Sequence, residues 1–265
     1  MISNAPIGIF DSGLGGLTVL KQIQNCLPDE DYIYFGDTAH LPYGSKSNDC
    51  IIDYSHNIVN FLISKNVKAV IIACNSASSV AKEPLQQQFD IPIFEVITPS
   101  VDHAINITNN NRIGVIGTEV TIKSKIYSQK ISNLDKSIYV EEIACPLFVP
   151  IIEESLENNN ITSDLVKLYL NPMIELNIDT LILGCTHYPI IKDQLSSFLP
   201  KQIKFITSGR PTGIALKKYL SENNQINCDG KGITHFYVSD DAEKFKHLGS
   251  KFLNNDINNI QLVQL

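Results

Sequence analysis

AVIIACNS at residues 69–76 and TLILGCTH at residues 180–187 are two versions of one pattern. Each begins with a short run rich in β-branched residues and leucine, which is typical of a fully buried strand, and continues into a cysteine, polar groups and a helical pattern. In an open α/β sheet, ligands bind where the strands end. The two stretches therefore predict an α/β fold with Cys74 and Cys185 at equivalent strand ends, an arrangement that suits a mechanism with two thiols.

The first part of the chain is echoed further along. IGIFDS at 7–12 is matched by IGVIGT at 113–118, and the strand-like stretch at 32–36 is matched by the one at 139–144. With the two cysteine stretches, these matches occur in the same order in both parts of the chain. They predict two related α/β halves, with chance similarity of buried strands as the alternative.

Apolar periodicity predicts the other elements. Strands are expected at 7–10, 32–35, 67–73, 91–97, 203–207 and 233–238, and helices at 48–65 and 211–222. Pro84 lies inside the helical pattern after Cys74, so we expect a break or kink near it. Asn-rich segments such as 109–111 and 254–259 indicate surface loops.

The composition is that of a globular protein with an acidic balance. The 265 residues are 43% hydrophobic, enough to bury a sizeable core, and the formal net charge is -7. This charge, together with only two arginines, argues against a nucleic-acid or membrane-surface partner. We expect neither a signal peptide nor a membrane span. The six scattered cysteines fit reduced thiols, which predicts a cytoplasmic location.

Glycine-bearing connections follow the first two predicted strands. DSGLGG at 11–16 lacks the dinucleotide fingerprint, because Thr18 stands where the third glycine belongs. This turn either offers free backbone N–H groups to an anion at a helix N-terminus or simply permits a tight bend. GDTAHLPYG at 36–44 is a long polar connection of the kind that often carries function.

Cys74 and Cys185 differ from the other cysteines because polar groups and an expected helix N-terminus follow each of them. The helix dipole and free N–H groups there favour a thiolate. No matched motif accompanies the other four cysteines. Cys26, Cys50 and Cys228 are interpreted as small apolar side chains. Cys145, which precedes Pro146, lacks a neighbouring cluster of polar residues.

Three other uses of these thiols are weaker. A zinc site usually needs paired C-x-x-C or H-x-x-x-H spacing, which is absent, and disulfide redox chemistry also lacks C-x-x-C. No metal is therefore expected. A Cys–His nucleophile for acyl transfer would explain Cys185 with His187 and leave Cys74 without a role.

Two opposed thiols suit proton transfer at a carbon atom. To invert a stereocentre, one base removes the proton from one face while an acid delivers a proton to the other face. The pair must therefore be one thiolate and one thiol. A free cysteine with a pKa of about 8.5 is only a few per cent ionised at pH 7, so its surroundings must favour the thiolate.

Six motifs in this order resemble one known family: IGIFDSGLGGLTVL, YFGDTAHLPYG, IIACNSAS, IGVIGTEVTIKS, CPLFVP and LILGCTHYP. The chain resembles the glutamate racemases, which are cofactor-independent members of the aspartate/glutamate racemase superfamily. The resemblance extends from Ile7 to about Tyr219. It implies two pseudo-symmetric α/β domains with the active site between them, formed by residues 1–97 plus 208–265 and by residues 98–207.

The resemblance also implies an activity and residue roles. The enzyme would interconvert L- and D-glutamate, and D-glutamate would feed peptidoglycan synthesis. Cys74 would be the base toward D-glutamate and Cys185 the base toward L-glutamate, assisted by Asp11, His187 and Glu153. From the residues alone, Asp11 can equally be a helix cap and Glu153 a solvated helix residue.

The same resemblance implies a substrate site made of hydroxyls, an amide and backbone groups, which are adequate donors for carboxylates. Asp11 and His187 would also contribute to it. Its other residues would be Ser12, Pro42, Tyr43, Gly44, Asn75, Ser76, Thr118, Thr121 and Thr186.

The sequence departs from the family pattern at a few places near the expected cleft. Ser76 replaces a threonine, Glu95 and Ser100 replace glycines, and Thr207 replaces an Asp or Asn. These changes bear on pocket shape and interdomain motion rather than on the chemistry. No cofactor is expected, since no lysine beside these motifs ends an apolar strand as pyridoxal phosphate would need.

Two rival functions remain open at this stage. One is a racemase of the same superfamily that acts on aspartate or another acid, and the other is a non-catalytic module that binds an acidic ligand. The family resemblance also raises the possibility of a homodimer, with no surface indicated.

Overall fold

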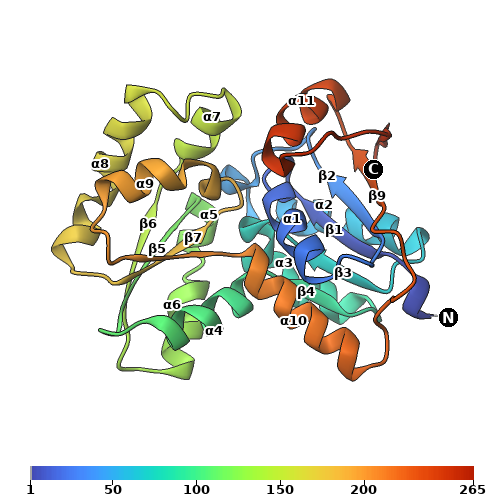
Figure 1. The fold of residues 1–265 in the computed structure, drawn as a ribbon, viewed down its shortest axis with the longest axis horizontal. Coiled ribbons are helices and arrows are strands. Elements are labelled where there is room, and N and C mark those ends of the chain that lie inside the picture. Colours follow the sequence, from blue (N-terminus) through green and yellow to red (C-terminus); the bar gives the residue numbers. More distant parts are fainter. Residues whose placement is uncertain (1) are drawn as a thin grey trace.

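The structure is a computed structural model that describes residues 2–265. The chain folds into two lobes that lie side by side, with both ends of the described chain in the same lobe (Figure 1). Each lobe contains one sheet, and every strand pairing in both sheets is parallel. The predicted α/β fold is confirmed.

The first lobe is built on a six-stranded sheet in the order β10-β9-β2-β1-β3-β4. Helices α1, α10 and α11 pack on one face and α2 and α3 on the other, which explains why the central strands are buried along their whole length. The strands are β1 (Ile7–Asp11), β2 (Tyr32–Gly36), β3 (Ala69–Ile72), β4 (Ile93–Glu95), β9 (Thr234–Val238) and β10 (Ile260–Leu262). The helices are α1 (Leu17–Cys26), α2 (Asn48–Ser64), α3 (Asn75–Gln88), α10 (Gly209–Glu222) and α11 (Ala242–Leu253).

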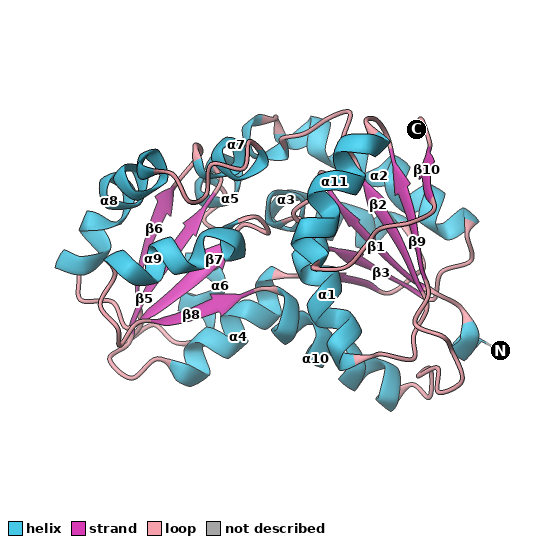
Figure 2. Cartoon of the chain, turned by 45° about the horizontal axis from the view of Figure 1, so that its top comes forward, coloured by secondary structure: helices cyan, strands magenta, loops and turns pink. Residues whose placement is uncertain are grey.

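The second lobe is built on a four-stranded sheet in the order β6-β5-β7-β8. Helices α4 and α6 cover one face, and α7, α8 and α9 cover the other (Figure 2). The strands are β5 (Arg112–Gly117), β6 (Tyr139–Ala144), β7 (Thr180–Gly184) and β8 (Lys204–Thr207). The helices are α4 (Ile97–Ile107), α5 (Glu119–Lys123), α6 (Ile126–Leu134), α7 (Phe148–Glu153), α8 (Asn160–Glu175) and α9 (Lys192–Phe198), with the 3₁₀ turn η3 (Tyr188–Ile191) before α9. The 3₁₀ turns η1 (Ile2–Asn4) and η2 (Tyr43–Ser45) belong to the first lobe.

The two sheets share a topology. The order β2-β1-β3-β4 in the first sheet recurs as β6-β5-β7-β8 in the second, so β3 and β7 occupy equivalent places. The prediction of two related halves from short sequence matches is confirmed. The domain boundaries at residues 97 and 208 remain a prediction. The four strands of the second sheet all lie between them, and α10 beyond residue 208 packs on α1 of the first lobe.

Two predictions about the ends of strands and helices need correction. The helix after Cys74 is continuous through Pro84 rather than broken, because its buried face, which includes Ala81 and Leu85, holds it against the sheet. The predicted strand 91–97 is shorter, and α4 begins at Ile97. The Glu95 carboxylate accepts hydrogen bonds from the backbone N–H groups of Ile97 and Thr98, which favours a helix start there.

The chain after Cys185 also differs from the expected helix. A turn comes first, then the 3₁₀ turn η3, and the helix α9 begins only at Lys192. Pro189 lies in η3, where its missing N–H is tolerated. Cys74, in contrast, directly precedes α3 as its N-cap residue. The two thiols therefore end matching strands but enter different local structures.

Candidate active site

The pocket that contains both thiols lies between the lobes, at the carboxyl ends of β1, β3, β5 and β7. The space open to a water-sized sphere there is about 20 Å³, room for about one water molecule. Admission of a small acid therefore requires the lobes or the loops to move. Its lining is formed by Ser12, Gly13, Leu41, Pro42, Tyr43, Gly44, Cys74, Asn75, Ser76, Thr118, Val149, Glu153, Cys185, Thr186 and His187.

Cys74 has a mainly neutral environment on the first lobe. Its side chain is buried, and its thiol lies 3.7 Å from the hydroxyl oxygen of Ser12. Burial raises the pKa of Cys74 to about 12, and the charge of Asp11 acts in the same direction. Cys74 is therefore a protonated thiol at neutral pH in this closed state.

Cys185 has a charged partner on the second lobe. Its sulfur lies 3.9 Å from Nδ1 of His187, whose Nε2 lies 3.1 Å from Oε1 of Glu153. Burial alone would lower the pKa of His187, but the hydrogen bonds and charges of Cys185 and Glu153 outweigh it and raise that pKa to about 10. The imidazolium stabilises negative charge on the sulfur.

Glu153 completes this row of charges. Burial alone would raise the pKa of Glu153, but His187 outweighs it and lowers that pKa, so the carboxylate is ionised at neutral pH.

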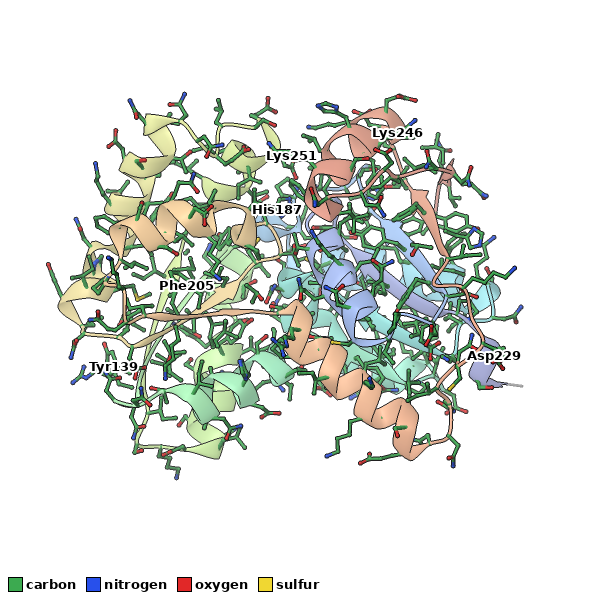
Figure 3. The ribbon with its side chains drawn as sticks, in the orientation of Figure 1. Tyr139, His187, Phe205, Asp229, Lys246 and Lys251 are labelled. Carbon is green, nitrogen blue, oxygen red and sulfur yellow. The ribbon has the colours of Figure 1, made fainter. Side chains whose placement is uncertain are left out.

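Helix α11 of the first lobe contacts the second lobe next to this site. The ring of Phe252 on α11 packs edge-on against the ring of His187, with ring centroids 5.9 Å apart. Lys251 on the same helix forms an ion pair with Glu157 of the other lobe, and Figure 3 shows Lys251 and His187 at the junction of the two lobes.

Asp11 lies beneath the pocket and does not line it. One carboxylate oxygen accepts a hydrogen bond from the backbone N–H of Gly13 at 3.0 Å, and the other accepts one from the hydroxyl of Thr186 at 3.4 Å. Complete burial raises the pKa of Asp11, although His187 opposes the rise. Asp11 thus joins a turn of the first lobe to the residue next to Cys185 in the second.

Hydroxyl groups at the pocket also bridge the lobes. Ser76 and Thr118 share a hydrogen bond of 2.8 Å, and Thr118 lies 3.2 Å from the hydroxyl of Thr121. Asn75 accepts a hydrogen bond of 2.7 Å from the hydroxyl of Tyr127. Ser76 and Asn75 belong to α3 of the first lobe, whereas the threonines and Tyr127 belong to the second.

Two glycines allow the lobes to approach this closely. A Cβ atom on Gly15 would lie 2.2 Å from Oγ1 of Thr186 and 2.5 Å from Nδ1 of His187, and one on Gly44 would lie 2.6 Å from Cβ of Thr118. Nearby, the hydroxyl of Thr18 donates to the carbonyl of Thr186 at 2.8 Å. Side chains at either glycine would push the lobes apart, so these positions serve close backbone approach.

Most of the predicted site residues come together here. Asp11 and Thr121 do not line the pocket but support residues that do. Sequence reasoning missed Gly13, Leu41 and Val149, although they lie within or next to the motifs that it identified. It also missed Tyr127, which belongs to no motif and reaches the site only through the folding of the second lobe.

Two features are absent from residues 2–265. The described side chains form no group of three or more His, Cys, Asp and Glu suited to a metal ion. None of the helices there has the length and apolar character needed to cross a membrane.

Comparison with known proteins shows the family to which this chain belongs. The model of the Asp/Glu/Hydantoin racemase family matches residues 7–210, which shows that the chain is an amino-acid racemase. The glutamate racemase of Geobacter metallireducens is 41% identical over 260 residues, covering 98% of this chain and 96% of the relative. This chain belongs to the Asp/Glu/hydantoin racemase family and, within it, to the glutamate racemases.

Two solved structures agree with this assignment. The glutamate racemase from Francisella tularensis in complex with D-glutamate is 40% identical, with a TM-score of 0.93 and coverage of 98% of each chain. The glutamate racemase from Thermus thermophilus in complex with β-chloro-D-alanine is 35% identical, with a TM-score of 0.89 over 99% of this chain and 98% of that one.

Proposed function

We propose that this protein interconverts L- and D-glutamate by a two-base proton transfer at Cα that needs no cofactor. The observation that carries the proposal is the pair of buried thiols, one from each lobe, at matching strand ends on a single pocket. The full-length similarity to glutamate racemases supports glutamate as the substrate.

The two thiols begin each turnover in different protonation states. With L-glutamate, the Cys185 thiolate takes the Cα proton from one face, and the electron pair of the broken C–H bond is delocalised into the α-carboxylate. The Cys74 thiol then delivers its proton to the opposite face, which leaves D-glutamate, a Cys185 thiol and a Cys74 thiolate. The reverse reaction exchanges these roles, so proton number and charge balance in both directions.

Charged neighbours assist the two sulfurs unequally. His187, held by Glu153, stabilises the thiolate of Cys185 before it acts as a base. Asp11 holds the turn at Gly13 and the hydroxyl of Thr186, which orients the groups beneath the substrate. In this scheme Cys74 and Cys185 are the catalytic residues, and Asp11, His187 and Glu153 support them.

The substrate carboxylates are held without arginine. Both arginines lie outside the pocket, and its donors are hydroxyls, the Asn75 amide and backbone N–H groups. We assign this binding to Ser12, Asn75, Ser76, Thr118 and Thr186 together with the turn of Pro42, Tyr43 and Gly44, and Thr121 supports Thr118 from behind.

The proposal extends to the setting of the enzyme. Its D-glutamate would supply peptidoglycan synthesis, its only partner in the reaction is the small-molecule substrate, and neither nucleic acid nor membrane takes part. All six cysteines are free thiols, which supports a reducing, cytoplasmic location. A homodimer is also proposed, on the family resemblance alone.

Incubation in heavy water tests the proposal most directly. Purified protein is incubated separately with L-glutamate, D-glutamate and L-aspartate, and the exchange of the Cα hydrogen for deuterium is followed together with optical rotation. We expect exchange and loss of rotation with both glutamate enantiomers and without added cofactor. Racemisation of aspartate alone would overturn the substrate assignment, and binding of glutamate without Cα exchange would overturn the enzymatic function.

A further inference from the structure

Tyr127 connects the second lobe to a substrate-binding residue of the first. It lies in α6, its side chain is fully buried, and its hydroxyl donates to Oδ1 of Asn75 at 2.7 Å. Asn75 is the first residue of α3, directly after Cys74. The hydrogen bond therefore crosses between the lobes beside one of the two thiols.

The other end of the Asn75 amide has no partner. Asn75 is 2% exposed and lines the pocket, and its Nδ2 is buried without a hydrogen-bond acceptor among the residues that the structure describes. Buried polar groups are almost always paired, so an orphaned donor at a pocket indicates a ligand that supplies the acceptor. The acceptor that fits a donor in this place is a carboxylate oxygen of the substrate.

The chemistry of the phenol fixes which way the amide faces. Burial raises the pKa of Tyr127 well above its ordinary value, and the charge of Glu95 acts in the same direction, so the hydroxyl keeps its proton. That single proton is directed at Oδ1 of Asn75. The amide flipped about its bond would lose this hydrogen bond and turn an oxygen toward the substrate carboxylate.

We propose that Tyr127 is a positioning residue that holds the Asn75 amide with Nδ2 toward the pocket, where it donates to a substrate carboxylate. This inference rests on the proposed glutamate racemase function. Because Tyr127 and Asn75 belong to different lobes, the donor is fixed in this orientation only when the lobes are together. Recognition of the carboxylate is thereby coupled to closure of the site.

Replacement of Tyr127 by phenylalanine removes the hydroxyl and keeps the ring. We expect Tyr127→Phe to raise KM about tenfold for both glutamate enantiomers, the effect of one lost orienting interaction, while kcat changes by less than about threefold. Asn75→Ala should raise KM by roughly 10- to 100-fold, since it removes a hydrogen bond to a charged group. The double variant should be no worse than Asn75→Ala alone, because the tyrosine acts through the amide.

Tyr32→Phe is the matched control. Tyr32 is also fully buried, and its hydroxyl donates to the carbonyl of Leu27, away from the pocket. The Tyr32→Phe variant loses a comparable hydrogen bond, and its KM should stay within about twofold of the KM of the parent. An unchanged KM in Tyr127→Phe, or an effect that adds in full to that of Asn75→Ala, would overturn the positioning role even though the parent enzyme racemises glutamate. A parent with no racemisation would instead refute the proposed function.

A second variant leaves Tyr127 intact. In Asn75→Asp the tyrosine still holds one oxygen, and the other oxygen takes the place of Nδ2 and repels the substrate carboxylate. We expect KM to rise above that of Asn75→Ala. If Asn75→Asp binds glutamate as well as the parent, the amide does not face the substrate as proposed.

Discussion

Cys74 and Cys185 end matching strands of two related sheets, yet the charged groups around them differ. Burial raises the pKa of the Cys74 thiol to about 12, and the charge of Asp11 acts in the same direction, while the hydrogen bond with Ser12 opposes the rise. Cys185 lies beside the imidazolium of His187. The repeat fixes where the sulfurs stand, and residues that the repeat does not preserve set the charge around each sulfur. In the closed site Cys74 is therefore protonated, and this is the form of the enzyme that accepts L-glutamate in the proposed reaction.

The sequence repeat shows where this asymmetry arises. Ser12 and Thr118 are equivalent hydroxyls at the ends of β1 and β5, but Asp11 is matched by Gly117 in the second half. His187 is likewise matched by Ser76. Each half has thus kept one thiol and acquired one different ionisable group. Substitutions that remove these groups test the comparison.

The largest expected effect comes from the thiols themselves. Cys74→Ser or Cys185→Ser should reduce racemisation by about 10²- to 10⁴-fold or more, because a serine hydroxyl is a much weaker acid and its alkoxide is not populated at neutral pH. Each variant should retain elimination from only one enantiomer of a substrate analogue with a β-leaving group. Rates are measured by circular dichroism and product release. Cys50→Ser and Cys228→Ser, at exposed thiols, are the controls. Parental rates in both active-site variants would disprove the two-base scheme.

A smaller effect is expected from His187→Asn, which distinguishes proton abstraction by Cys185 from proton abstraction by Cys74. Because the enantiomers are equal in energy, kcat/KM must fall by the same factor in both directions, so racemisation alone hides the asymmetry. Elimination exposes it. We expect about a 10²-fold loss for the L-analogue, on which Cys185 is the base, and less than about threefold for the D-analogue. Equal losses for both would show that His187 does not serve one thiol. His56→Asn, whose ring contacts Asn60 on α2, is the control.

Much of this site was predictable because it follows strands. Buried β-branched runs predicted β1, β3, β5 and β7, and the polar residues directly after them line the pocket. Family motifs supplied the roles of Asp11 and Glu153, which residue type alone left open. The shared sheet order could be expected from the short repeat, since buried strands keep their pattern where surface residues do not.

Contacts between distant segments were not predictable. Tyr127 reaches Asn75 only because the lobes face each other, and no local pattern marks it. The tail from residue 220 carried no diagnostic motif, yet α11 places Phe252 against His187 and β10 extends the first sheet. Periodicity also failed after Cys185, where the 3₁₀ turn η3 precedes the helix that begins at Lys192. These features depend on tertiary packing, which a local pattern does not record.

The smallest effect is expected from Glu153→Gln, which acts on Cys185 only through His187. The pKa of His187 is about 10 in the folded protein and 6.5 ordinarily, so this raised pKa adds stability that is fully present below pH 6.5 and is lost as the pH rises through about 10. The pKa of Glu153 is lowered from 4.5, so its contribution is present above pH 4.5 and is lost as the pH falls. The melting temperature of the parent should therefore exceed that of Glu153→Gln most between pH 4.5 and 6.5.

Activity should follow the same titration. Without the carboxylate, the pKa of His187 falls, the imidazolium is lost at a lower pH, and the alkaline limb of the kcat/KM profile moves to lower pH. At pH 7 we expect about a tenfold loss, less than for His187→Asn because the ring remains. Glu142→Gln is the matched control, since Glu142 is a buried carboxylate that pairs with Lys125 outside the pocket. An unshifted alkaline limb in Glu153→Gln would mean that Glu153 does not sustain the charge on His187, and the asymmetry between the thiols would then rest on His187 alone.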